Sequence, residues 1–243
     1  MTKTVALVGA TGRMGQLFGA LITASPDFEL VASLDSTTPL EAMNGADLVV
    51  DVTVPAVSQR VVEHALGNRQ PVLVGTSGWS GERIAALRPI VEADPELGVV
   101  IIPNFSIGSV LATSMAATAA RFFDSIEIVE AHHATKVDSP SGTAVRTAEL
   151  MLAARGDRGP VAAPHVDQRA RGQQVSSIPI HSMRMHGVVA KQDVVFGGTG
   201  ELLTISHETL SPSSYEAGIL IALKATPSAR GVVVGLDRLI DLG

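Results

Sequence analysis

The first half of the chain alternates between short apolar runs and longer segments with a mixed pattern. The apolar runs predict buried strands over residues 4–8, 30–34, 48–51, 72–74 and 98–102. The intervening segments predict helices over 16–24, 56–66 and 81–93, with Pro55 opening the second and Ser80 capping the third. This order predicts an α/β fold with a Rossmann-like doubly wound parallel sheet, which binds ligands at the carboxyl ends of its strands.

The pattern changes after residue 105. An apolar helix is expected over 107–123, followed by a strand over 126–131, an irregular loop that contains a His-His pair, and a helix over 142–154. Residues 155–175 are rich in Gly, Pro and charges and predict an irregular, mobile connection. Strand-like runs near 178–185, 188–196 and 202–210 are separated by His186-Gly187 and by 197–200, which predict hairpins in a mixed, mostly antiparallel sheet.

The end of the chain returns to the apolar pattern. Residues 213–216 match a capping box for a helix over 214–224. An all-apolar strand over 231–234 suits the parallel sheet, and a short helix over 236–242 is expected to close the chain. We therefore predict a dinucleotide-binding domain of residues 1–105 with 214–243, and a smaller α+β domain of residues 106–213.

A glycine-rich turn joins the first strand to the first helix. In the Gly-x-x-Gly-x-x-Gly spacing of residues 9–15, Gly9 permits a tight turn, Gly12 lets the backbone approach a pyrophosphate, and Gly15 permits close helix–strand packing. By itself the motif is weak, since a purely structural glycine turn is an alternative.

Asp35 strengthens the prediction of a dinucleotide site. It ends the second strand 20 residues beyond Gly15, where an acid binds the adenine-ribose hydroxyls and repels a 2′-phosphate. NADH therefore ranks first, while Arg13 in the glycine loop leaves NADPH open. The later loops should border the nicotinamide, although each could be a simple βα turn. The full set of expected cofactor-binding residues is Gly9, Ala10, Thr11, Gly12, Arg13, Met14, Gly15, Asp35, Thr53, Gly75, Thr76, Ser77, Ile102, Pro103, Asn104 and Phe105.

Composition excludes several classes of function. The net charge of −6 gives no support to nucleic-acid binding, and the absence of cysteine excludes disulfides and thiolate chemistry. No apolar run approaches the ~18 residues of a membrane span, and the first residues lack a signal-peptide pattern, so we expect a cytoplasmic protein. The seven histidines show no metal-binding spacing, so no metal site is expected.

Residues 130–144 concentrate the candidate chemistry. His132, His133 and Lys136 precede a helix start at 141–143, and free N–H groups at a helix start favour an anion. A polar loop with a structural histidine pair is the alternative. The combination of cations, a proton-transfer group and a helix start instead indicates a site that holds an anion and moves a proton.

The same stretch resembles the 4-hydroxy-tetrahydrodipicolinate reductase family, also called dihydrodipicolinate reductase, in a shorter, actinobacterial-like form. The resemblance rests on Glu130-Ala131-His132-His133, Lys136, Asp138 and Pro140-Ser141-Gly142-Thr143-Ala144, and extends to residues 9–15, 51–55, 74–78, 103–108, 196–201 and His207. The chain departs from the family at Val52, Ser77, Ser139 and Pro212, none of which removes a residue expected to be catalytic.

The resemblance implies roles for individual residues. His132 is expected to donate and accept the proton, and Lys136 to be a second donor that also binds substrate. His133, Ser141, Gly142 and Thr143 are expected to bind a small anionic dicarboxylate. The resemblance also implies reduction by NADH or NADPH in lysine and diaminopimelate synthesis. It assigns residues 106–213 to substrate binding and to assembly of a homotetramer through paired sheets.

Two other functions fit part of the pattern. A different small-molecule dehydrogenase would use the same scaffold and anion-binding loop on another substrate. A dinucleotide-sensing regulatory protein would bind the cofactor without catalysis. A substrate panel separates the first from the reductase, and cofactor binding without turnover would identify the second.

Overall fold

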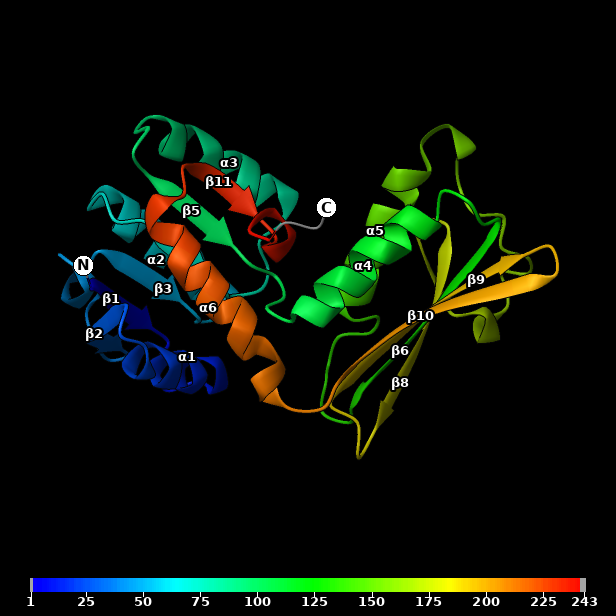
Figure 1. The fold of residues 1–243 in the computed structure, drawn as a ribbon, viewed down its shortest axis with the longest axis horizontal. Helices are drawn as coiled ribbons and strands as arrows, with labels where there is room; N and C mark the ends of the chain where they lie inside the picture. Colours follow the sequence, from blue (N-terminus) through cyan, green and yellow to red (C-terminus); the bar gives the residue numbers. More distant parts are fainter. Residues whose placement is uncertain (1, 241–243) are drawn as a thin grey trace. The chain divides into compact units, whose positions relative to one another are not determined.

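The computed structural model describes residues 2–240, which divide into two compact units (Figure 1). The first unit contains the described residues up to Ser106 and those from Tyr215 onward, and the second contains Ile107–Ser214. The chain therefore leaves the first unit once and returns to it.

The first unit is built on a six-stranded parallel sheet in the order β11-β5-β4-β3-β1-β2. All six strands lie within two residues of their predicted bounds, and the doubly wound fold is confirmed. The strands are β1 Lys3–Val8, β2 Phe28–Leu34, β3 Leu48–Asp51, β4 Val72–Val74, β5 Gly98–Ile101 and β11 Gly231–Val234. The central strands are buried on both faces, which explains their continuous apolar sequences.

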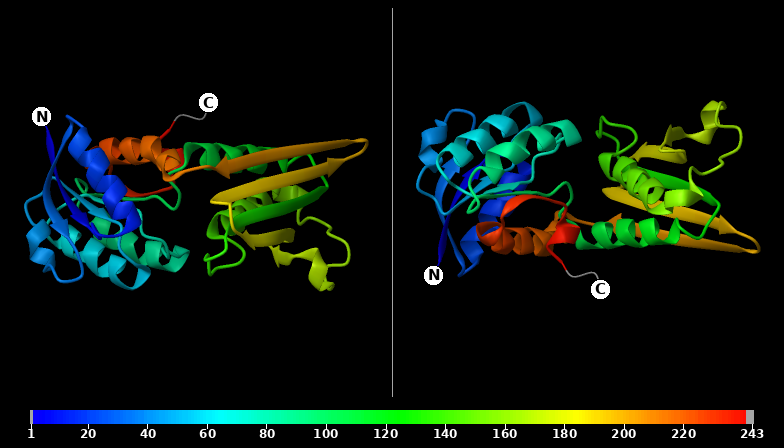
Figure 2. Two further views of the ribbon diagram at one scale, coloured as in Figure 1. Left: turned by 90° about the horizontal axis from the view of Figure 1, so that it is seen from below. Right: turned by 90° about the horizontal axis from the view of Figure 1, so that it is seen from above.

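Helices cover both faces of this sheet (Figure 2). The helices are α1 Arg13–Ala24, α2 Pro55–Gly67, α3 Gly81–Glu92 and α6 Glu216–Ala225, with short 3₁₀ turns at Leu40–Met43, Thr226–Ser228 and Leu236–Arg238. Ala6 and Val8 pack into the cluster that includes Val61 and Leu87 of α2 and α3. Leu7 points to the opposite face, where it approaches Gly19 of α1. The alternation along β1 therefore supplies both layers of the core.

Three expectations for the helices of this unit are wrong. Helix α1 begins at Arg13, three residues before the predicted start, and Gly12 is its N-cap. The capping box does not form: Pro212–Tyr215 make a 3₁₀ turn, Tyr215 is the N-cap of α6, and the Ser213 hydroxyl pairs with that of Ser211. The expected closing helix is only the turn Leu236–Arg238, and residues 241–243 lie outside the described residues.

The second unit contains a five-stranded sheet in the order β10-β9-β6-β8-β7. Strands β6 and β8 are parallel and the other pairs are antiparallel, as expected for a mixed, mostly antiparallel sheet. The strands are β6 Ser125–His133, β7 Gln173–Val175, β8 Ile178–Met185, β9 Ala190–Gly198 and β10 Glu201–Thr209. Ile126, Ile128 and Phe196 face α4 Ile107–Ala119 and α5 Gly142–Arg155, which form the other half of the core.

Two sequence signals in this unit were misleading. Helix α4 ends at Ala119, four residues before the predicted end. Just beyond it, the carbonyls of Ala120 and Phe123 accept hydrogen bonds from the buried Arg155. The His186-Gly187 turn does not join a hairpin, because β6 lies between β8 and β9 and pairs with both. The Thr199-Gly200 turn does connect a hairpin, between β9 and β10.

The segment between α5 and β8 is less irregular than expected. It contains 3₁₀ turns at Gly156–Arg158 and Arg169–Arg171 as well as strand β7. Across residues 2–240, no helix has both the length and the apolar composition needed to cross a bilayer.

Candidate active site

The His-His pair lies on a strand and not in a loop, which corrects the expectation from the sequence. Strand β6 extends to His133 because His132 and His133 pair with Arg184 and Met185 of β8, and His132 also pairs with Ala190 of β9. Successive side chains of a strand point to opposite faces. His132 therefore shares a face with Glu130, while His133 lies on the other face, with its Nδ1 2.8 Å from the Thr135 hydroxyl.

A buried carboxylate lies directly beside His132. The Glu130 side chain has no exposed surface, and its Oε2 is 2.6 Å from Nδ1 of His132. The Arg184 guanidinium binds the same carboxylate with both terminal nitrogens, at 2.9 and 2.8 Å. Sequence reasoning missed Arg184, which is 54 residues away from Glu130 and carries no local motif.

The surroundings of His132 favour its neutral form. Partial burial lowers the pKa of His132, the hydrogen bond and negative charge of Glu130 raise it, and the positive charges of Lys136 and Arg184 lower it again. The net pKa lies below the usual value for histidine. The imidazolium form of such a histidine is a stronger acid, but it is populated only toward lower pH, so a general acid of this kind works below its pKa.

Lys136 and the start of α5 both bind the carboxylate of Asp138, a residue of the same loop. The Lys136 ammonium is 2.7 Å from Oδ1 of Asp138, and the Asp138 carboxylate also accepts a hydrogen bond from the N–H of Gly142. Burial opposes ionisation of Asp138, but these bonds and the charge of Lys136 outweigh it, so the pKa of Asp138 is below its usual value. The two groups expected to bind a substrate carboxylate thus already bind a carboxylate in this structure.

The first turn of α5 has the features of an anion site. Ser141 is the N-cap, its hydroxyl accepting from the N–H of Ala144, and its own N–H donates to Glu130. The first turn carries no acidic residue, and a side chain added at Gly142 would meet no atom within 4 Å. The cap gives Ser141 a structural task, and the roles of Ser141, Gly142 and Thr143 as substrate ligands stay predictions.

The glycine loop of the first unit has little room for side chains. Gly9 has a φ of +90°, and a Cβ there would lie 2.6 Å from the carbonyl oxygen of Val52. A Cβ at Gly15 would lie 2.1 Å from the Gly9 oxygen, so this glycine packs against the loop itself. A Cβ at Gly12 would be 3.4 Å from that oxygen, which is ordinary contact. Gly12 therefore leaves open space, and α1 behind it has no acid in its first turn.

These contacts predict different consequences for two alanine variants. Gly15→Ala should lower the free energy of unfolding by about 3 kcal/mol, because its methyl group overlaps backbone atoms. Gly12→Ala should change stability by less than about 1 kcal/mol, and weaken dinucleotide binding by obstructing the pyrophosphate. Chemical denaturation and cofactor titration measure both. Equal loss of stability in the two variants would contradict the division of roles.

Asp35 stays ionised throughout the neutral range. The hydroxyl and N–H of Thr37 and those of Thr38 all donate to its Oδ1, which lowers the pKa of Asp35 to about 2. Its carboxylate is therefore a fixed negative charge at the end of β2. Arg13, at the start of α1, is exposed.

The loops after β3, β4 and β5 lie side by side because these parallel strands are neighbours. Asp51, fully buried at the end of β3, accepts from the N–H and hydroxyl of Thr53 and from the Ser58 hydroxyl, to which Trp79 donates at 2.9 Å. Sequence reasoning missed this support for Thr53.

Other predicted cofactor residues are buried. Phe105 is 4% exposed and contacts Phe18 edge-to-face, with ring centroids 5.4 Å apart. Thr76 and Ile102 are also buried. Side chains of this group therefore contribute to the core, and their contacts with a cofactor stay predictions.

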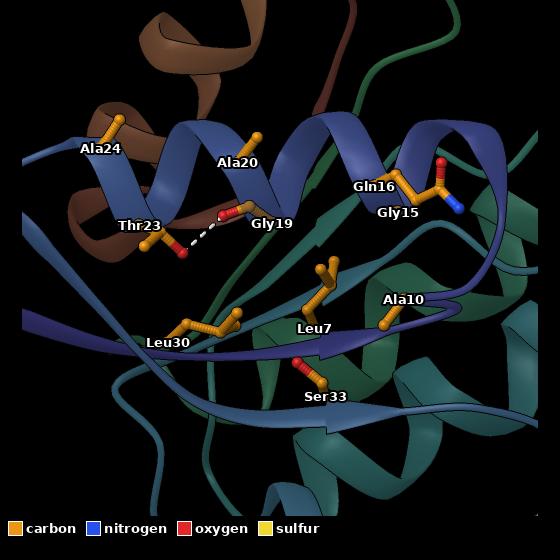
Figure 3. Close-up of a pocket in the computed structure, with 10 residues that line it drawn as sticks. All are labelled: Leu7, Ala10, Gly15, Gln16, Gly19, Ala20, Thr23, Ala24, Leu30 and Ser33. Carbon is orange, nitrogen blue, oxygen red and sulfur yellow. Dashed lines mark hydrogen bonds between the residues drawn. The ribbon is translucent and has the colours of Figure 1, made fainter.

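A hollow of about 500 Å³ lies between α1 and strands β1 and β2 (Figure 3). Its lining carries no charged side chain: Leu7, Ala10, Gly15, Gln16, Gly19, Ala20, Thr23, Ala24, Leu30 and Ser33. It therefore lacks the groups that an anionic substrate needs. Within residues 2–240 no group of three or more His, Asp or Glu side chains could hold a metal ion.

Comparison with known proteins decides the family. The model of the dihydrodipicolinate reductase N-terminus matches residues 3–105, and that of its C-terminus matches residues 108–240. This chain belongs to the dihydrodipicolinate reductase family. The predicted resemblance is thereby confirmed.

Curated relatives match this chain over all or nearly all of its length. The 4-hydroxy-tetrahydrodipicolinate reductase of Clavibacter sepedonicus is 72% identical over 100% of this chain and 87% of the relative. That of Streptomyces griseus is 42% identical over 98% of each chain. These relatives confirm the expected actinobacterial-like character.

Solved structures include a member of the same family and a more distant protein. Dipicolinate-bound dihydrodipicolinate reductase from Paenisporosarcina sp. TG-14 superposes with a TM-score of 0.84 at 30% identity, covering 99% of this reductase-family chain and 100% of the other. GenD2 from gentamicin A biosynthesis in complex with NAD has a TM-score of 0.63 at 14% identity over 93% of this chain and 86% of the other. The second likeness shows a shared fold alone.

Proposed function

We propose that this protein reduces 4-hydroxy-tetrahydrodipicolinate to tetrahydrodipicolinate with NADH or NADPH, with release of water, in lysine and diaminopimelate synthesis. The observation that carries the proposal is the cluster formed by His132, Lys136 and the start of α5. It combines a proton-transfer group with a cation and backbone N–H groups suited to a carboxylate. Membership in the reductase family supports the same reaction.

The cofactor has a fitting site in the first unit. Gly12 leaves the start of α1 accessible, no acid lies in its first turn, and Asp35 is an ionised acceptor for ribose hydroxyls. When bound, NAD(P)H supplies the hydride, which goes to ring carbon four of the substrate. The overall reaction adds one hydride and one proton and releases one water.

The residues of the second unit bind substrate and move the proton. Lys136 and the N–H groups of Gly142 and Thr143 bind a carboxylate, which takes over contacts that Asp138 makes in this structure. His132 in its cationic form donates from Nε2 to the ring, because Nδ1 is bonded to Glu130. His133 is proposed as a further substrate ligand.

A coupled assay tests this proposal. Dihydrodipicolinate synthase, pyruvate and aspartate semialdehyde generate the substrate in place, and absorbance follows oxidation of NADH and of NADPH. Oxidation that depends on the synthase is expected. Cofactor binding without oxidation, by folded protein, would contradict the proposal and favour a sensor, whereas oxidation with another oxo or imino acid alone would favour a different dehydrogenase.

Cofactor preference should depend on two opposed charges. The wild-type protein is expected to prefer NADH, because the Asp35 carboxylate repels a 2′-phosphate. Asp35→Asn should raise the NADPH-to-NADH ratio of kcat/KM by about five- to tenfold, the effect of removing about 1 kcal/mol of repulsion. Arg13→Ala should lower the same ratio. Steady-state rates with both cofactors test this, and an unchanged ratio in both variants would contradict the assignment.

We also propose that the protein forms a homotetramer through the second unit. The face of its sheet opposite α4 and α5 carries the exposed apolar side chains of Met183 and Met185, which are two residues apart on β8. Exposed apolar patches of this kind mark interaction surfaces. Light scattering coupled to size exclusion measures the mass, and a monomer at working concentration would contradict the proposal. A cytoplasmic location stays a prediction.

A further inference from the structure

Four polar side chains meet on the helix-covered face of β6 and β8. The parallel pairing puts Glu130 beside Ser182 and His132 beside Arg184. On β6 the same face carries Ile126 and Ile128, which are buried in the core. Glu130 is the next residue on this face, so a charged group follows two apolar ones. A carboxylate at such a position is costly unless it is ionically paired and fully hydrogen-bonded.

Glu130 meets that requirement through five donors. Arg184 binds both oxygens, Ser182 donates its hydroxyl, Ser141 donates its N–H at 3.2 Å, and His132 donates from Nδ1. Burial opposes ionisation of Glu130, but these bonds outweigh it, and the pKa of Glu130 lies below its usual value. Glu130 is therefore an acceptor with no hydrogen of its own.

This charge state dictates the tautomer of His132. An ionised carboxylate can only accept, so the hydrogen between Glu130 and His132 belongs to Nδ1. In the neutral imidazole Nε2 then has no hydrogen, and in the cation Nε2 carries the proton that can be transferred. A partner that holds one ring nitrogen in this way also fixes the plane of the ring.

We propose that Glu130 is a positioning residue for proton transfer by His132, and that Arg184 keeps Glu130 in place. Arg184 extends the support to the neighbouring loop by donating to the Asp138 carbonyl at 2.7 Å. The kinetic part of this inference rests on the proposed reductase function. The protonation state of His132 does not, and can be measured without turnover.

The charges around His132 determine the sign of the pH effect. Glu130 is the group that raises the pKa of His132, whereas burial, Lys136 and Arg184 lower it. Glu130→Gln removes the raising group, so the His132 pKa should fall further. A reaction that needs the imidazolium loses rate as pH rises through this pKa. The basic limb of the kcat/KM profile should therefore move to lower pH.

The chain offers a matched control on the same strand. Glu127 also binds an arginine and a histidine, namely Arg171 and, at 2.7 Å, His181, but it points to the opposite face of β6. Glu127→Gln removes the carboxylate charge from a similar Glu–Arg–His cluster that does not contact His132. Effects that come simply from losing a carboxylate of β6 should appear in both variants.

The experiment combines kinetics with ¹⁵N NMR of the imidazoles, in which His132→Gln identifies the His132 signals. Wild-type His132 should be protonated at Nδ1 when neutral. Glu130→Gln should lower kcat by about 10- to 100-fold, with a small change in KM, a lower His132 pKa and an acid-shifted basic limb. Glu130→Asp, which keeps the charge, should restore part of the His132 pKa. Glu127 lies on the sheet face proposed for assembly, so the mass of Glu127→Gln is first confirmed by light scattering. With the wild-type mass, Glu127→Gln should leave all four properties near wild type.

Several results would overturn the proposal. A neutral wild-type His132 with its hydrogen on Nε2 and not on Nδ1 would do so before any variant is made, so the inference is testable even if Glu130→Gln does not fold. A folded Glu130→Gln protein with an unchanged His132 pKa and pH profile would also overturn it, as would equal effects of Glu127→Gln. If the NMR results hold but wild type shows no synthase-dependent oxidation, the reductase function fails and the positioning contact stands.

Discussion

Replacement of His132 by Gln is expected to lower kcat by about 10²- to 10⁴-fold, the usual contribution of a general acid. Glutamine can hydrogen-bond Glu130 and roughly fill the space, but it has no proton to transfer at neutral pH. Dinucleotide affinity should change little, because the glycine loop and Asp35 belong to the first unit. The loss should appear in kcat and kcat/KM together, as expected for an interaction made in the transition state.

His181→Gln is the matched control for this variant. His181 also contacts a glutamate of β6, with Nε2 2.7 Å from Glu127, but it lies on the opposite face of the sheet. His181 lies on the sheet face proposed for assembly, so light scattering first confirms the wild-type mass of His181→Gln. The coupled assay and a cofactor titration should then show near wild-type values for His181→Gln and normal cofactor binding for both variants. Turnover at the wild-type rate in His132→Gln would remove His132 from the mechanism.

Replacement of Lys136 by Ala should damage both substrate binding and turnover. The change removes a cation from a site for a dianion and leaves Asp138 as an unpaired negative charge beside it. The hydrogen bond and charge of Lys136 help to lower the pKa of Asp138, which should rise toward its usual value in the variant. Loss of a charged contact together with this repulsion should reduce kcat/KM by about 10²-fold or more, with a raised KM.

Lys191→Ala separates this effect from simple loss of an ion pair. Lys191 pairs with Asp193 at 3.0 Å, with the same two-residue spacing as Lys136 and Asp138, and lies opposite Ala131 of β6, on the sheet face away from α4 and α5. It should retain wild-type kcat/KM, while Lys136→Arg should recover part of the substrate affinity. Initial rates over a range of synthase-generated substrate concentrations measure these values. A Lys136→Ala protein with wild-type KM and kcat would contradict the assigned anion site.

Local sequence predicted much of the first unit, because its elements carry strong local signals. The central strands 48–51 and 72–74 are buried on both faces and are therefore continuous apolar runs, which explains why they have the predicted bounds. The edge strand 231–234 is only partly buried, but it is also a continuous apolar run and has the predicted bounds. The cap at Ser80 also forms as predicted. The capping box at 213–216 failed, because a 3₁₀ turn that begins at Pro212 carries the chain past Ser213 before α6 starts.

The second unit was harder to predict because its pairing is non-local. His186-Gly187 has the residues of a hairpin turn, yet β6, more than 50 positions earlier, lies between the strands that this turn joins. That same pairing extends β6 to His133 and so places His132 and His133 on opposite faces. A loop containing both histidines, as the sequence suggested, would not distinguish them.

The sequence by itself determined the doubly wound sheet, the glycine turn with its acid at Asp35, and the concentration of His132, Lys136 and a helix start within residues 130–144. Those features depend on apolar periodicity and on short spacings, which are properties of neighbouring residues. Only the tertiary structure decided that Glu130 is a buried carboxylate held by Arg184 and bonded to His132. The strand pairing that brings residues 130 and 184 together closes a long loop, and no local signal encodes it.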